Sequence, residues 1–447
     1  MYLVPGPASS TDNEIVRYDG TTGTLIKSDA TNPTTIDDNG NFSGPAIETS
    51  GNNVALGRSI SKNSGTSNVL VGNNAGFSLV PGSNNNVLIG NSAGAFSTTI
   101  SNSVFIGLNA GISTTVDGNT FIGFRSGVFN TSGNENTFVG NNTGTNNSIG
   151  VSNTFIGNLA GNTNTTGNNN TFIGDNSGRS NTTGNDNTFL GTDSGRDNTT
   201  GLNNVFLGKN SGLSNTSGNN NVFLGTESGV LNITGEENTF LGNSAGNRNT
   251  RNGNTFIGFA SGFANTTGDN NVFIGRISGQ NNTTANNNVF VGNRSGGNNT
   301  IGESNTFLGP TSGFANTTGN LNTYVGNAVA ENNNGSENTI LGNSAGRDMT
   351  NVSGTVLIGN NAGRNNTQNN RLMIDNTSTN EPLLDGDFTG DTLQVNGEAT
   401  LGQTGNTTNV HSINGLTEAF AGGIDRYLVV NINGTRYKLA VYQDFAP

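Results

Sequence analysis

The chain has 447 residues, of which 30% are hydrophobic, 11% are charged and 68 are glycine. This composition supplies too few apolar residues for the two or three globular cores that the length would allow, and without a repeating pattern it would indicate disorder. Cysteine is absent, which excludes disulfides and thiolate metal sites. The net charge is −12 and no basic cluster is present, so we expect no nucleic-acid partner.

Residues 1–50 form a leader that does not repeat. Its start, MYLVPGPASS, lacks the charged and apolar regions of a secretory signal. Asp-Gly, Thr-Gly and Asn-Gly pairs separate short apolar segments at residues 15–18 and 24–26, which predicts short strands and turns. No apolar run in the chain approaches the roughly 18 residues of a membrane span, so we expect none.

Residues 51–370 are expected to form a repeating shaft, because one phrase, with the consensus N-T/V-F-I/L-G-x-x-S-G-x-x-N-T-T-G-x-N, recurs in most cases every 17 residues. Its aromatic positions are Phe121, Phe138, Phe155, Phe172, Phe189, Phe206, Phe223, Phe240, Phe256, Phe273, Phe290, Phe307 and Tyr324. Ala55, Leu70, Leu88 and Phe105 precede this series, Ile340 and Leu357 follow it, and the whole gives about 19 coils. So short a fixed period predicts an all-β parallel solenoid (β-roll), in which each coil packs only on its neighbours.

The first five residues of the phrase have the character of a strand, since β-branched and aromatic residues gather there. Alternate residues of a strand face opposite sides, so Phe223 points one way and Val222 and Leu224 point the other. Both faces are apolar, which is typical of a strand covered on both sides. One cover is the interior of the coil, and the simplest supplier of the other is a second and third copy of the chain. We therefore expect a homotrimer, intertwined or side by side.

Three kinds of glycine recur at fixed positions of the repeat. Gly174 and its equivalents end the strand, Gly178 and its equivalents leave room at a crowded corner, and Gly184 and its equivalents close the N-T-T-G turn. The asparagine before each strand is expected to bond its own backbone or to stack on its counterpart one coil away.

Residues 371–447 form the tail, and its end carries the clearest local signal. Asn433-Gly434 separates two apolar runs, at residues 427–432 and 435–442. Asn-Gly supplies the two positive-φ residues of a type I′ turn, so a C-terminal β-hairpin is predicted.

Two other features of the tail are candidates for a metal site. Asp385, Asp387 and Asp391 lie in the string DGDFTGD, but the glycine and the distal glutamate of an EF-hand loop are missing. A turn is the preferred interpretation and an ion site the alternative. His411 is the single histidine, and it has neither a second histidine nor a cysteine as partner, so a structural or exposed role is expected.

Asn-x-Thr/Ser sequons recur at one phase of the repeat, so turn formation explains them better than glycosylation does. These asparagines are Asn164, Asn181, Asn198, Asn215, Asn232, Asn265 and Asn316. Paired threonines at the same phase, such as Thr165–Thr166 and Thr182–Thr183, would stack into an outer ladder. Regular threonine arrays can bind ice, which leaves a monomeric solenoid that binds ice or glycan as an alternative.

No catalytic site can be assembled from the sequence. The glycines lead into neither a helical pattern nor a GK[ST] phosphate loop, and no nucleophile–base pair is recognisable. We therefore expect a protein that is not an enzyme and that uses no cofactor.

The repeat phrase resembles the head repeats of trimeric adhesins of the YadA type, whose shorter repeats carry a V-A-I-G phrase, and it is closer to longer-period relatives in bacteriophage tail fibres and surface proteins. The resemblance covers roughly residues 53–363. The leader phrase TDNEIVRYDGTTGTLIKSDATNPTTIDDNGN resembles a segment of phage tail-fibre and other virion appendage proteins. The tail phrase LMIDNTSTNEPLLDGDFTGDTLQVNG is similar to a segment that often follows such repeats.

These resemblances imply a homotrimeric fibre of a virus particle that is assembled in the host cytoplasm, because neither a secretory signal nor a membrane anchor is recognisable. A non-viral bacterial surface adhesin is the alternative. The leader would attach the fibre to a virion protein, the coils would act as a rigid spacer, and the hairpin would cap the trimer. Residues expected at the tip, as contacts for a host glycan or protein or as capping residues alone, are Tyr427, Arg436, Tyr437, Lys438 and Tyr442.

Overall fold

The computed structural model describes residues 54–57, 65–378 and 381–396 with their side chains. It also gives the backbone of six short strands outside those ranges, two near the N-terminus and four near the C-terminus. Strands, turns and bends make up the described residues, and none of them is helical, so no helix of this part could cross a membrane. The leader strands expected at residues 15–18 and 24–26 lie outside the described residues. The chain consists of two compact units, residues 1–252 and residues 253–447, and each is described by itself.

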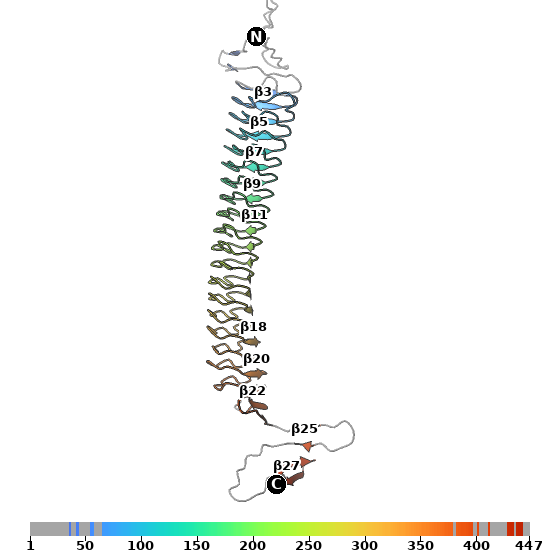
Figure 1. Cartoon of the computed structure of the whole chain (residues 1–447), viewed down its shortest axis with the longest axis vertical. Helices are drawn as coiled ribbons and strands as arrows, with labels where there is room; N and C mark the ends of the chain where they lie inside the picture. The colour runs from blue at the N-terminus through green and yellow to red at the C-terminus, as the bar shows by residue number, and fades with distance from the viewer. Residues whose placement is uncertain are drawn as a thin grey trace, which may run out of the picture. The chain divides into compact units, whose positions relative to one another are not determined.

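The first unit contains one antiparallel pair and a stack of parallel strands (Figure 1). The antiparallel pair is β1 (Thr35–Ile36) with β2 (Phe42–Ser43). The parallel strands are β3 (Val54–Leu56), β4 (Val69–Val71), β5 (Val87–Ile89), β6 (Val104–Ile106), β7 (Thr120–Ile122), β8 (Thr137–Val139), β9 (Thr154–Ile156), β10 (Thr171–Ile173), β11 (Thr188–Leu190), β12 (Val205–Leu207), β13 (Val222–Leu224) and β14 (Thr239–Leu241).

The second unit continues the same repeat and then changes direction. Its parallel strands are β15 (Thr255–Ile257), β16 (Val272–Ile274), β17 (Val289–Val291), β18 (Thr306–Leu308), β19 (Thr323–Val325), β20 (Thr339–Leu341), β21 (Val356–Ile358) and β22 (Arg371–Ile374). The antiparallel strands that follow are β23 (Leu384–Asp387), β24 (Thr392–Val395), β25 (Thr400–Leu401), β26 (Val410–His411), β27 (Tyr427–Ile432) and β28 (Thr435–Ala440).

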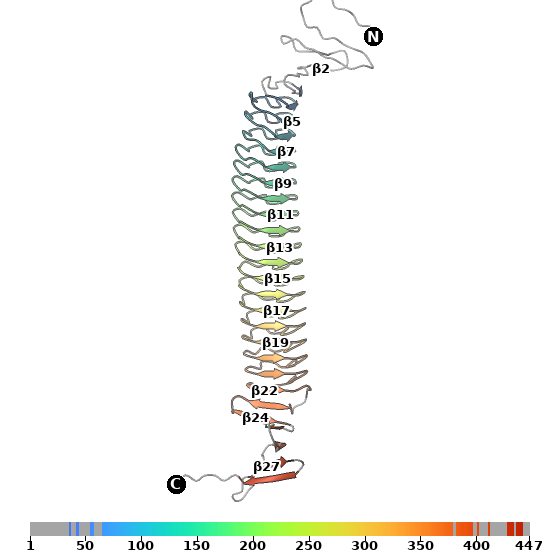
Figure 2. The same cartoon turned by 90° about the vertical axis from the view of Figure 1, so that its right-hand side faces the viewer.

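Within each unit the parallel strands pair in chain order, one coil on the next (Figure 2). Equivalent residues of the repeat are direct partners, as Phe172 is with Phe189 and Phe273 with Phe290. The parallel β-solenoid predicted from the period is therefore confirmed, with about 18 turns at about 17-residue spacing.

The aromatic positions line the inside of the coils. Every ring from Phe105 to Tyr324 in this series has no exposed surface. Neighbouring rings within a unit are stacked, with centroids 4.7–5.0 Å apart and interplanar angles of 4–13°. One ring per coil thus forms a continuous apolar column through each unit, and the strand spacing of parallel sheets sets the spacing of the rings.

Two ladders of buried asparagines run beside the ring column. The asparagine before each strand forms the first: Asn187 donates from Nδ2 to Asn170 Oδ1 (3.2 Å) and to the Gly201 carbonyl (2.8 Å). The sequon asparagine forms the second: Asn181 Nδ2 donates to Asn164 Oδ1 (2.7 Å) and to the Gly184 carbonyl (3.1 Å). Such amide ladders satisfy buried polar groups coil after coil, which lets a chain with few apolar residues form a buried interior.

The turns explain why the chain is rich in glycine and asparagine. Gly178 has φ +56°, and a Cβ there would lie 2.5 Å from the Phe172 ring. Gly174, with φ +138°, lies against Gly191, whose carbonyl oxygen would be 2.4 Å from an added Cβ. Two further positions of the repeat have a left-handed backbone without glycine, for example Asn176 (φ 55°) and Asp186 (φ 57°), and asparagine and aspartate tolerate this conformation best. Gly184 has no positive φ; its Cβ would instead meet Asn181 Oδ1 and the Gly201 carbonyl.

After the last coil, antiparallel strands replace the parallel stack. β22 pairs antiparallel with β23, and an ion pair between Arg371 and Asp385 joins them. β27 and β28 form an antiparallel pair with Tyr427 opposite Ala440 and Ile432 opposite Thr435, as a C-terminal hairpin requires. The Asn433-Gly434 turn itself lies outside the described residues.

Candidate assembly surface

The outward side of the coil strands forms one face in each unit, which we call the strand face. It consists of the first and third residues of every parallel strand from β3 to β21. The first residue is threonine or valine and the third is isoleucine, leucine or valine. The central residue between them points inward and is at most 4% exposed in every strand of the stack. The sequence therefore places polar residues in the turns and keeps both sides of the strand largely apolar.

Side chains of the strand face are partly exposed in a single chain. In the first unit Leu190 and Leu241 are each 44% exposed, and Val222 is 40% exposed. In the second unit Ile274 is 36% and Leu341 is 47% exposed. Because the strands are paired residue for residue, these side chains repeat at the same interval of about 4.8 Å that separates the rings. Each unit thus presents a regular, largely apolar face, and its side chains stay partly exposed beside the described residues of the chain.

The sequence predicts that both sides of the strand are covered. In the single chain, the inward side is covered by the coil itself and is fully or almost fully buried, whereas the outward side remains partly exposed. Contiguous apolar surface of this kind marks interaction sites in soluble proteins.

The sequon asparagines do not reach the surface. Asn164, Asn181, Asn198, Asn215, Asn232, Asn265 and Asn316 are all fully buried. Their side-chain amides bond the next asparagine of the ladder or a backbone carbonyl of the turn, as in the case of Asn198, whose Nδ2 lies 2.9 Å from Asn181 Oδ1. Glycosylation at these nitrogens is incompatible with this fold, and the interpretation of the sequons as structural is supported.

The paired threonines beside the sequons are also part of the coil structure. The first threonine of a pair donates its hydroxyl to the next coil, either to the backbone, as Thr165 does to the Thr182 carbonyl at 2.9 Å, or to a side chain, as Thr317 does to Asn334 Oδ1 at 3.0 Å. The second threonine, such as Thr183, is exposed. In the expected outer ladder, the hydroxyl of the first threonine of a pair is therefore used in hydrogen bonds within the chain, and the second threonine is left at the surface.

The aspartates of the tail close a turn. Asp387 accepts a hydrogen bond from the Thr389 backbone amide at 2.8 Å, and its bonds with Thr389 hold the pKa of that exposed carboxyl below its usual range. Asp385 pairs with Arg371, and Asp391 has a left-handed backbone (φ 51°). No group of three or more histidine, aspartate or glutamate side chains suited to a metal ion occurs among the residues described with side chains.

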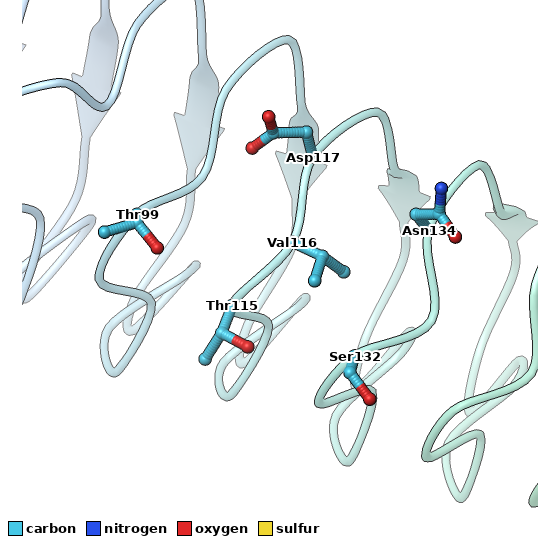
Figure 3. Close-up of a pocket in the computed structure, with 6 residues that line it drawn as sticks. All are labelled: Thr99, Thr115, Val116, Asp117, Ser132 and Asn134. Atoms are coloured by element: carbon cyan, nitrogen blue, oxygen red, sulfur yellow. The ribbon is translucent and has the colours of Figure 1, made fainter.

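A shallow hollow lies over three successive coils of the first unit (Figure 3). Thr99, Thr115, Val116, Asp117, Ser132 and Asn134 line it. Asp117 is its single ionisable residue, and its Oδ1 accepts a hydrogen bond from the Ser101 amide at 2.7 Å. The hollow thus contains no acid–base pair and no activated nucleophile, and its polar atoms are partly used by the coils themselves.

The side chains proposed for the tip lie outside the described atoms. Tyr427, Arg436, Tyr437 and Lys438 belong to β27 and β28, of which only the backbone is described, and Tyr442 and the His411 side chain lie outside the described atoms. Sequence reasoning missed the charged residues at the borders of the strand face, such as Asp269 and Arg276 on either side of β16. Their signal is a fixed position in the repeat, which can be read only when the strand boundaries are known.

Comparison with known proteins gives no assignment. No family model, no curated protein and no solved structure matches this chain.

Proposed function

We propose that the chain is a structural fibre of a virus particle, of the kind that forms bacteriophage tail or capsid fibres, and that three copies associate through their strand faces. The single observation that carries the proposal is the half-exposed, largely apolar strand face that runs along the coils of each unit. The resemblance of the leader, the repeat phrase and the tail phrase to virion appendage proteins supports the viral setting. The fibre then serves as a rigid spacer and in attachment to the host surface.

A second copy of the chain is the occupant that fits this face. A partner that covers the face along many coils must repeat every 4.8 Å or so, and another solenoid of the same period does this without any mismatch. Because the Phe rings lie inside each chain, the Thr/Val and Ile/Leu columns are the ones that meet at the axis. Burial of this apolar surface is the driving force for association.

Light scattering on the purified chain tests the association. We expect a mass of three chains at micromolar concentration. A single-chain mass under conditions where the coils are folded, as judged by circular dichroism, contradicts the proposal.

The viral setting has its own test, which is whether the chain is present in purified particles. Removal of the residues after Asp425 asks what the tail does. Loss of trimers assigns β27 and β28 to capping, and normal trimers that no longer bind host cells assign them to host contact. Normal trimers that bind as the parent does contradict both roles.

The alternative function, a monomeric solenoid that binds ice or glycan, has one observation in its favour. Threonines occupy the first position of five successive strands, β7–β11, and so stand in register on the outward side. Regular outward hydroxyls suit an ordered ligand lattice. Inhibition of ice recrystallisation by a monomeric fraction would favour this alternative over the fibre.

A further inference from the structure

The strand face has two borders that differ in charge. We define the entry edge as the two residues that precede the asparagine before each strand, and the exit edge as the two residues that follow the glycine after it. In the coil of β16, the entry edge is Asp269–Asn270 and the exit edge is Arg276–Ile277. The strand and its flanking residues separate these edges within one chain by roughly 15 Å of extended backbone.

Every charged residue on the entry edge of the coils from β4 to β21 is acidic, and each is at least partly exposed. These residues are Asp117, Glu135, Asp186, Glu236 and Glu237 in the first unit and Asp269, Glu303 and Glu337 in the second. Neither lysine nor arginine occurs at these positions of those coils. The entry edge is therefore a negatively charged border of the strand face.

In the coils from β4 to β21, every basic residue at either edge lies on the exit edge. In the first unit these are Arg125 and Lys209, and in the second Arg276 and Arg294. Each is exposed, and each lies within one coil of an entry-edge carboxylate. Asp117 and Arg125 flank the same strand, β7, and Asp269 and Arg276 flank β16.

The exit edge also carries acidic residues: Asp175, Asp193 and Glu227. One of them has a cation of its own chain beside it, since Arg196 Nη1 lies 4.0 Å from Asp193 Oδ1. The asymmetry thus lies in the entry edge, whose charged residues in the coils from β4 to β21 are all acidic, and in the position of the four basic residues on the exit edge.

The symmetry that relates the copies determines which edges of their strand faces meet. When copies are related by rotation about an axis parallel to the coil stack, the entry edge of each copy meets the exit edge of the next. When two copies are related by a two-fold axis that runs along the strand direction, perpendicular to the coil stack, their stacks are antiparallel and entry edge meets entry edge, so carboxylates face carboxylates. Like charges that face each other oppose association, and complementary charges fix its register.

We propose that the copies assemble parallel and coil-for-coil in register, with Asp117 of one copy paired with Arg125 of the next and Asp269 paired with Arg276. This inference rests on the proposed function, since it takes the strand face as the surface that meets other copies. It adds which edges meet and which residues pair. The apolar columns are nearly the same in every coil, so they favour association even when one copy is shifted by one or more whole coils. The edge charges differ from coil to coil and therefore favour a single register.

Engineered cysteines test the pairing directly, because the chain has no cysteine. In the Asp269→Cys/Arg276→Cys variant the two sulfurs of one chain are too far apart for a disulfide, which needs Cα atoms within about 7 Å. Mild oxidation is expected to link separate chains into a species of three chains on a denaturing gel. The matched control is Asp269→Cys/Arg179→Cys, because Arg179 is exposed but lies away from both edges.

The outcomes separate this inference from the proposed function. Equal cross-linking in the control, or an assembled parent whose Asp269→Cys/Arg276→Cys variant stays uncross-linked, overturns the pairing and leaves the fibre intact. A parent that is monomeric by light scattering overturns both.

Charge reversal gives a second readout without oxidation. Arg276→Asp is expected to weaken association roughly tenfold, since it changes one pair in each of three interfaces. Adding Asp269→Arg in the same chain is expected to restore the parent value. Failure of the second change to rescue the first, with both chains folded, overturns the pairing.

Discussion

The two sides of the same short strand follow different rules. On the inside, one ring repeats with almost no variation, and every ring is buried by its own chain. On the outside, the first position is threonine or valine and the third is isoleucine, leucine or valine. The exposed aliphatic side chains of this face range from 36% exposed at Ile274 to 47% at Leu341. The inner side needs one shape that stacks on itself, whereas the outer side needs only a regular apolar surface. We infer that the inner side determines the fold of one chain and the outer side determines its association.

The largest effect is expected from a charge placed on the inner side. Phe223→Asp removes a ring that is stacked between Phe206 and Phe240, with centroids 4.8 and 4.7 Å away, and leaves a carboxylate without partners. We expect a loss of about 5 kcal/mol or more in the free energy of unfolding, measured by urea titration with circular dichroism. Leu224→Asp, one residue away on the outer side, is the control and is expected to leave the fold of the chain intact. Similar losses in both variants would show that the two sides do not differ as described.

The next effect concerns the polar part of the interior. Asn181→Ala removes a donor to Asn164 Oδ1 and to the Gly184 carbonyl, and it takes away the acceptor of Asn198 Nδ2. The Gly184 carbonyl keeps its bond from Asn170 Nδ2, and Asn198 Nδ2 keeps its bond to the Gly201 carbonyl, so Asn164 Oδ1 is the atom most affected. Since a buried polar group that loses its partner costs about 1–3 kcal/mol, we expect a loss of about 2 kcal/mol. Thr183→Ala, on the exposed surface two residues away, is expected to change the same free energy by less than about 0.5 kcal/mol. An Asn181→Ala variant as stable as the control would show that the ladder contributes nothing.

The inner ring column could be predicted from the sequence because it depends on one residue type at one interval. Phe172 and its equivalents show the period whatever the turns between them do. The β-branched and aromatic residues around the ring then predict a strand. Because alternate residues of a strand face opposite sides, the residues on either side of the ring are predicted to face outward. The choice of the hairpin strands near residues 427–440 likewise depended only on a local turn signal.

Other parts could not be predicted, because they depend on the path of the backbone between strands. The sequon asparagines have the sequence of exposed turn residues, and only the coil geometry brings Asn164 and Asn181 into one buried ladder. The left-handed conformation of residues such as Asn176 is also set by the path of the turn. The edge charges are a third case, since Arg276 and Asp269 border a face only when the strand between them is known. The number of copies stays a prediction, because a single chain shows an uncovered face and not what covers it.

A smaller effect is expected at the one inner ring that carries a polar group. The Tyr324 hydroxyl accepts a hydrogen bond from Asn333 Nδ2 at 3.1 Å, and burial raises the pKa of this phenol well above its usual range. A raised pKa means that the stability is complete below the unfolded value of about 10 and falls as the pH rises above it, by at most about 1.4 kcal/mol per pH unit.

Tyr324→Phe removes this titration. The variant is expected to lose no more than about 1 kcal/mol near neutral pH, because Asn333 Nδ2 still donates to the Val352 carbonyl at 2.9 Å. The free energy of unfolding of parent and variant is measured by urea titration at pH 9 and pH 11, and the difference between the two proteins separates the effect of Tyr324 from that of the other tyrosines. If this difference in free energy is the same at both pH values, Tyr324 is not a buried neutral phenol.

The smallest effect on the chain itself is expected on the outer side, where the effect on association is the largest. Leu190→Lys with Leu241→Lys places two lysines three coils apart on the strand face of the first unit, and both leucines are 44% exposed in the single chain. Exposed substitutions of this kind change the stability of one chain by less than about 0.5 kcal/mol.

In an assembly of three chains, however, the same two changes bring six ammonium groups toward a shared apolar axis, where burial of an unpaired charge is costly. We therefore expect a folded, monomeric variant whose melting temperature no longer depends on protein concentration, while that of the parent rises with concentration. If the parent also melts at a temperature independent of concentration, the outer side is an ordinary surface and the difference between the two sides of the strand has no role in assembly.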